Sequence, residues 1–123
     1  MKRTVLNPKW GISTCCEVDN IVFIGHHGGH TTKDGKKLLT IEEQTEETFH
    51  NLKVTLDTIG LTFDDIISVN VLLRTIKDFQ GMHSVWQRWF VNKYPARTAF
   101  TTDFVDEHCL IQVNAVAYRE PKQ

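Results

Sequence analysis

The sequence predicts an α+β domain: one mixed sheet of about six strands, with two helices on one of its faces. Two segments, 40–60 and 78–92, repeat apolar residues every three or four positions, as one face of a helix does. Shorter apolar or alternating segments lie before, between and after them, and each has the length of a strand. This order fits one compact unit, so residues 1–123 are expected to form a single domain.

The segment before the first helix predicts a short edge strand and two longer strands, over 2–6, 12–18 and 20–25. A tight hairpin is expected at Asp19-Asn20, because both residue types tolerate left-handed backbone conformations. The glycine-rich residues 26–37 predict a loop, and residues 37–39 predict one more brief strand.

The first helix has signals at both ends. Thr40 and Glu43 form a capping box, in which the Thr40 hydroxyl binds a free backbone N–H of the first turn. Gly60 is the residue type that commonly follows the last helical turn. The predicted buried stripe consists of Ile41, Thr45, Phe49, Leu52, Leu56 and Ile59.

The second half predicts three strands and the second helix. The strands are expected over 66–74, 97–102 and 110–118. The residues of the first strand that would face the helices are Ile67, Val69, Val71 and Leu73. The second helix would pack through Phe79, Met82, Trp86 and Phe90 and end before Pro95. In the last strand Gln112, Asn114 and Val116 would point away from the core.

The second face of the sheet is predicted to be partly apolar. Leu72, Leu110 and Val116 would lie on it, and two helices can cover only the other face. A half-apolar face of this kind favours burial against further copies of the chain, although the pattern does not give their number.

Charge and composition exclude several classes of function. The formal net charge is −1, which counts against a nucleic-acid binder because such proteins carry clustered positive charge. We find no segment with the apolar character of a signal peptide or a membrane span. Three cysteines without a CxxC pair favour a reduced, cytoplasmic protein.

Several motifs resemble those of one family. They are residues 20–25 (NIVFIG), 43–52 (EQT to NL), 78–90 (DF to WF), 95–98 (PART) and 113–117 (VNAVA). The most specific of them is PART, which matches a Pro-Ala-Arg-Ser/Thr motif, and VNAVA resembles a closing strand that reads IEAIA. Over about residues 10–118 the chain is therefore similar to the RidA/YjgF family, also labelled endoribonuclease L-PSP.

The resemblance implies a fold like that of trimeric chorismate mutase and a homotrimer with clefts between subunits. It also implies hydrolysis of 2-imino or enamine acids to 2-keto acids and ammonia, without a metal or an organic cofactor. Arg97 would hold the substrate carboxylate, since a guanidinium matches a carboxylate with two parallel hydrogen bonds. Backbone N–H groups near Gly25-His26 and Thr98-Ala99 would assist.

The chain departs from the family pattern at positions that matter for catalysis. Asn114 stands where the deaminating members carry a glutamate; an amide can hold a water molecule but cannot accept a proton near neutral pH. Ala99 replaces a frequent cysteine. On the second helix His83 replaces an asparagine, and a histidine titrates near neutral pH. We therefore expect Asn114 to position water and His83, with His26 or His27, to supply a titrating group.

Three functions remain open on this evidence. The first is an imine-hydrolysing enzyme, and the second is a non-catalytic module that senses a small carboxylate in the same cleft, which Asn114 favours. The third is the ribonuclease of the family's older label, which would need a basic track that the sequence lacks. A metal site at His26, His27 and His30 is not expected, because adjacent histidines in a glycine loop rarely bind one ion.

Overall fold

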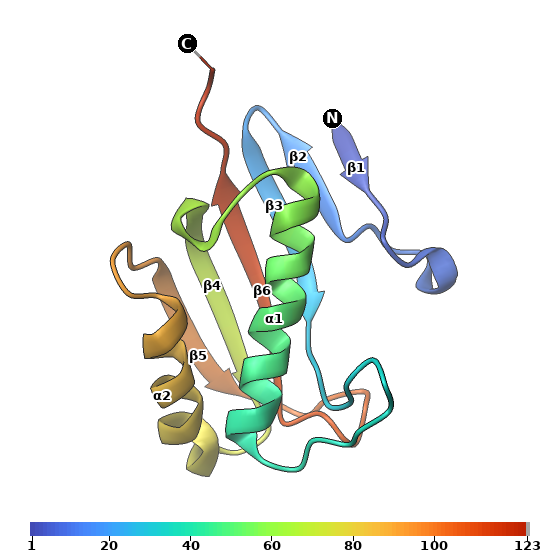
Figure 1. The fold of residues 1–123 in the computed structure, drawn as a ribbon, viewed down its shortest axis with the longest axis vertical. Coiled ribbons are helices and arrows are strands. Elements are labelled where there is room, and N and C mark those ends of the chain that lie inside the picture. The colour runs from blue at the N-terminus through green and yellow to red at the C-terminus, as the bar shows by residue number, and fades with distance from the viewer. Residues whose placement is uncertain (123) are drawn as a thin grey trace.

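The computed structural model describes residues 1–122 and contains one six-stranded sheet with both α-helices on the same face (Figure 1). The strands are β1 (Lys2–Thr4), β2 (Cys15–Val18), β3 (Ile21–His27), β4 (Ile66–Leu73), β5 (Ala96–Thr101) and β6 (Ile111–Tyr118). They lie in the order β1-β2-β3-β6-β4-β5, and β4 and β5 pair in parallel while the other neighbours pair antiparallel. The predicted α+β class, with a mixed sheet, is confirmed.

The predicted turn and cap signals are confirmed. Asp19 and Asn20 both have positive φ, 48° and 69°, as a two-residue hairpin between right-twisted strands requires. Helix α1 (Ile41–Ile59) begins with the full capping box, since the Thr40 hydroxyl accepts from the Glu43 N–H at 3.1 Å and the Glu43 carboxylate accepts from the Thr40 N–H at 3.3 Å. Gly60 follows the helix with φ of 76°.

Helix α2 (Phe79–Trp89) is shorter than the predicted 78–92. A 3₁₀ turn, Ile76–Asp78, precedes it, and Phe90 already leaves the helical conformation, with φ of −107° and ψ of 87°. This exit places the Phe90 ring in an aromatic cluster, 4.2 Å from Trp86 and 5.8 Å from Phe49 between ring centroids. Burial of that ring therefore ends the helix earlier than the sequence pattern indicates.

Two further predictions were wrong. Ile67 does not face the helices: Ile66 is buried, whereas Ile67 is 47% exposed. A register shift between Ile66 and Ser68 inserts one residue, which reverses the alternation at the start of β4. Residues 37–39 form no strand, and Lys37 makes only an isolated bridge with Thr31 within the loop.

The hydrophobic core lies between the helices and one face of the sheet. Phe49, Leu52 and Leu56 of α1 and Met82 and Val85 of α2 are 0% exposed. The matching face of β6 is also buried, through Ile111, Val113, Ala115 and Ala117. This alternation along β6 is the one predicted.

No helix covers the opposite face of the sheet among the described residues (Figure 1). Several large apolar side chains of this open face are exposed: Val18, Phe23, Ile67 and Phe100, at 40, 53, 47 and 46%. Within residues 1–122, neither helix has the length and apolar character needed to cross a membrane.

Candidate functional site

Arg97 lies on the edge strand β5, at a hollow of about 540 Å³ between this strand and α2. In the parallel pairing, Arg97 is in register with Val69, whose side chain is buried beneath the helices. Arg97 therefore points toward the helical face of the sheet. The other side chains of the hollow are His83, Trp86, Gln87, Phe90, Val91, Tyr94 and Pro95, so aromatic rings and polar groups share its walls.

The guanidinium of Arg97 rests on aromatic rings and has a single hydrogen-bonded side-chain partner. Its Cζ lies 4.7 Å from the centre of Trp86 and 5.4 Å from that of Phe79, and Nη1 donates to His83 Nδ1 at 3.0 Å. Among residues 1–122 no carboxylate forms an ion pair with it. Burial lowers the pKa of Arg97, but a guanidinium stays charged at neutral pH. Such a cation, with donors to spare, is suited to bind an anion.

His83 lies on α2 one turn after Phe79 and one turn before Trp86, and its ring stacks on Phe79 with centroids 5.8 Å apart. A guanidinium can only donate hydrogen bonds, so His83 Nδ1 must present its lone pair to Arg97. The proton of the neutral ring then lies on Nε2. In this arrangement His83 offers an N–H donor to a ligand at Nε2, and Nε2 can act as an acceptor only in the other tautomer, which gives up the Arg97 contact.

Thr98 and Asn114 lie on the other face of the sheet from Arg97. Thr98 is in register with Asn70, and Asn70 Nδ2 donates to Asn114 Oδ1 at 3.0 Å. Ala99 returns to the helical face, where it is exposed. Within one chain, therefore, the structure brings His83 to Arg97 but does not bring Asn114 to it.

Gly25 and His26 lie on β3, which β6 and β4 separate from β5. The Gly25 N–H donates to the Thr14 carbonyl at 2.9 Å, so it is not available to a ligand in the same chain. His27 turns inward, where its ring nitrogens contact Thr55 Oγ1 at 2.7 Å and the Gly25 carbonyl at 2.9 Å. Of these three residues, His26 is the exposed one.

Phe79 and Trp86 have a second role that the sequence pattern did not show. They were predicted as core residues, and both do contact the core, but they also form the floor under Arg97. Phe79, His83 and Trp86 are spaced by four and three residues, which places all three on one helical face; this spacing was the sequence signal for their shared role.

Gln112 is the second amide on the open side of β6, two residues from Asn114.

Comparison with known proteins agrees with this architecture. A sequence profile described as endoribonuclease L-PSP matches residues 6–119. The chain belongs to this family. The RidA/YjgF name applies to the same group, and a structure from Streptococcus pyogenes described as a yjgF family member superposes with a TM-score of 0.83 and 25% identity, covering 98% of this chain and 97% of the other.

Two relatives show the range of names within the RidA/YjgF family. A RutC family protein of Pyrococcus horikoshii is 34% identical over 109 residues, which cover 88% of this chain and 86% of the relative. A human protein named 2-iminobutanoate/2-iminopropanoate deaminase is 25% identical over 105 residues, which cover 85% of this chain and 77% of the relative. The family is thus shown, while the deaminase name belongs to a less similar relative.

Proposed function

We propose that this RidA/YjgF protein binds a small carboxylate at Arg97 and hydrolyses 2-imino or enamine acids to 2-keto acids and ammonia. The observation that supports this most strongly is the Arg97 guanidinium, which lies on Trp86 and Phe79 without a carboxylate partner among the described residues. Partial burial of the guanidinium against aromatic rings strengthens such a charge-assisted pair relative to one in water. The reaction type is that named for the more distant relatives.

The proposed chemistry needs one positioned water and one hydrogen-bond donor at the imine nitrogen. The oxygen of the water adds to the C=N carbon, both of its protons pass to the nitrogen through solvent, and the C–N bond breaks to give ammonia and a ketone. Arg97 would fix the carboxylate, and the His83 Nε2–H would donate a hydrogen bond to the imine nitrogen. An amide such as Asn114 would orient the water without taking its proton.

The proposed site is completed by a second copy of the chain. Arg97 lies on the helical face of an edge strand, whereas Asn114 and Thr98 lie on the open face and His26 on β3. A neighbouring subunit can supply these groups to the Arg97 hollow, and the apolar open face gives it a surface to pack on. We therefore propose a homotrimer with the site between subunits. The three free cysteines support a reducing, cytoplasmic location.

A carboxylate-sensing module is the second candidate function. It is favoured by the Asn70–Asn114 hydrogen bond, which uses the Asn114 carbonyl and presents no carboxylate where a general base is expected. Such a module would keep the Arg97 interactions and turn over no substrate.

The test is to generate 2-iminobutyrate in situ and follow its decay with wild-type protein, Arg97→Lys and Arg88→Lys. Arg97→Lys keeps the charge but loses the planar fork, so the proposed deaminase should lose at least tenfold in rate. Arg88, an exposed arginine of α2 that does not line the hollow, is the control, and Arg88→Lys should change nothing. Binding of 2-ketobutyrate, measured by calorimetry, should weaken in parallel.

The outcomes separate the two functions. If the wild-type protein does not accelerate imine decay but binds 2-ketobutyrate through Arg97, the deaminase is refuted and the sensing module is supported. No binding and no acceleration would refute both. Asn114→Glu and Gln112→Glu then test whether a carboxylate on the open side of β6 raises the rate, as expected if a proton acceptor is missing.

A further inference from the structure

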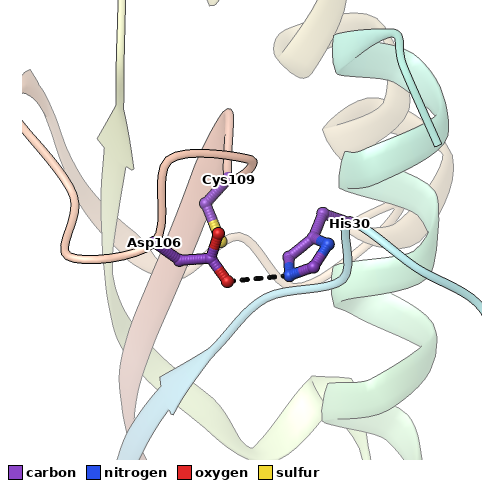
Figure 2. A group of neighbouring side chains, drawn as sticks. All are labelled: His30, Asp106 and Cys109. Atoms are coloured by element: carbon purple, nitrogen blue, oxygen red, sulfur yellow. Dashed lines mark hydrogen bonds and ion pairs between the residues drawn. The ribbon is translucent and has the colours of Figure 1, made fainter. Parts of the chain in front are cut away.

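Three side chains of metal-ligating types meet in a group outside the Arg97 hollow. His30 follows β3, and Asp106 and Cys109 belong to the loop between β5 and β6. Their donor atoms all lie within 4.8 Å of one another, and His30 Nε2 is 2.9 Å from Asp106 Oδ2. Figure 2 shows the three side chains pointing toward one another from these two loops.

The separations fit a tetrahedral ion. Zinc binds nitrogen and oxygen ligands at about 2.0–2.2 Å and thiolate at about 2.3 Å, so its tetrahedral ligands lie roughly 3.3–3.8 Å apart. The His30–Asp106 contact of 2.9 Å is shorter than this range and no pair exceeds 4.8 Å, so small side-chain rotations would admit an ion among the three donors.

Each of the three donor groups is oriented by a hydrogen bond at an atom or face that the ion would not use. His30 Nδ1 contacts the Thr31 hydroxyl at 2.9 Å, and Asp106 Oδ1 accepts from the His108 N–H at 2.8 Å. Cys109 Sγ accepts from Gln112 Nε2 at 3.8 Å. Outer contacts of this kind orient the ligands of metal centres and raise their affinity.

The two loops are also held in place by the rest of the fold. Arg74, at the end of β4, donates to the carbonyls of Asp106 and Cys109 at 2.7 and 2.8 Å. The His30 carbonyl accepts from the Leu38 N–H at 2.9 Å. Because hydrogen bonds already fix the backbones of both loops, binding an ion would cost less conformational entropy.

We propose that His30, Asp106 and Cys109 bind a divalent cation of the zinc class, with water in the fourth position. The mixed nitrogen, oxygen and sulfur set suits Zn²⁺ or Co²⁺ and not Mg²⁺ or Ca²⁺, which take oxygen ligands. Binding breaks the S–H bond of Cys109 and releases its proton to solvent, so a thiolate and a carboxylate balance the two positive charges of the ion.

The proposed site is open to solvent, since the His30 and Asp106 side chains are 31% and 44% exposed, which leaves the ion a path to it. Because the ion must displace the proton of the Cys109 thiol, affinity is expected to fall as the pH is lowered.

The test uses Co²⁺ as a spectroscopic probe on the full chain under reducing, anaerobic conditions. Wild-type protein should take up one equivalent and show a sulfur-to-cobalt charge-transfer band with intense tetrahedral d–d bands. Cys109→Ser should abolish the charge-transfer band. His30→Ala should weaken binding at least tenfold and keep the thiolate. Competition with a chromophoric chelator then gives the Zn²⁺ affinity.

Cys16→Ser is the matched control, because Cys16 is a partly exposed cysteine on β2, outside the group. It should bind Co²⁺ as the wild type does. The proposal fails if the wild type shows no band at millimolar Co²⁺. It also fails if the band survives Cys109→Ser and disappears in Cys16→Ser. Circular dichroism of each variant separates loss of the site from loss of the fold, and His30→Ala gives a second answer if Cys109→Ser does not fold.

Discussion

Three histidines of this chain differ in what their ring nitrogens contact. His83 Nδ1 accepts from Arg97, His30 contacts Asp106 and Thr31, and His27 is held between Thr55 and the Gly25 carbonyl. Because the Gly25 carbonyl can only accept, His27 Nδ1 carries a proton and Nε2 accepts from the Thr55 hydroxyl. The neutral ring satisfies both contacts; in a charged ring the Thr55 hydroxyl would change from donor to acceptor, so burial is what disfavours the charged form.

His27 is expected to make stability depend on pH. Burial lowers its pKa below the ordinary value of 6.5, so the unfolded chain binds a proton that the folded chain resists. Its contribution is fully present above about pH 6.5 and is lost as the pH falls through this value toward the lower folded pKa. Urea unfolding from pH 8 to 5 should show a slope of at most about 1.4 kcal/mol per pH unit from this group.

His27→Gln should flatten that pH dependence, because an amide does not titrate in this range. His50→Gln is the control, since His50 is an exposed histidine on α1. If His27→Gln kept the wild-type slope, the lowered pKa of His27 would not be its source.

Among the secondary structure elements, α1 and α2 approach closely at Gly81. A Cβ built on Gly81 would lie 2.5 Å from Ile41 Cγ2 and 2.8 Å from a Glu42 carboxylate oxygen. Ile41 is buried and β-branched, so it cannot swing aside freely. The absence of a side chain at Gly81 therefore sets the distance between the helices, and with it the place of His83 beside Arg97.

Gly81→Ala is expected to destabilise the protein by about 1–3 kcal/mol, in spite of the better helix propensity of alanine, because the added methyl group overpacks this contact. Chemical denaturation measures the loss. Ser84→Ala, at an exposed position of the same helix, should stay within about 0.5 kcal/mol of the wild type. Equal stability of Gly81→Ala and wild type would show that the helices can separate without cost.

At the scale of the whole molecule, the open face of the sheet leaves large apolar side chains exposed. The exposed side chains of this face come from four strands, β2, β3, β4 and β5: Val18, Phe23, Ile67 and Phe100. No helix covers them among the described residues. Burial of this apolar area against other copies would be favourable at roughly 25 cal/mol per Å². The same assembly would complete the proposed carboxylate site.

Phe23→Asp is expected to shift the assembly toward the monomer, since a carboxylate would be buried in the contact. Sedimentation velocity over a concentration series measures the change. Ile76→Asp is the control, because Ile76 is 77% exposed in the 3₁₀ turn before α2. A wild type that stays monomeric at all concentrations, or a Phe23→Asp variant that assembles normally, would contradict the proposed trimer.

The sequence by itself determined the local structure of this protein. The capping box at Thr40, the hairpin at Asp19-Asn20 and the alternation of β6 each depend on residues close together in the chain, and all are confirmed. The predictions that were wrong depend on longer-range contacts. The bulge at Ile67 is set by pairing with β6, and the end of α2 by the place of Phe90 in the core.

The tertiary structure alone decided which distant residues meet. The strand order and register place Arg97 and Asn114 on opposite faces of one sheet, although they lie only 17 positions apart in the chain. The same topology brings His30 to Asp106 and Cys109 across 76 residues or more. Side-chain periodicity fixes the face that a residue occupies within its own strand, but which strands become neighbours depends on how the whole core packs.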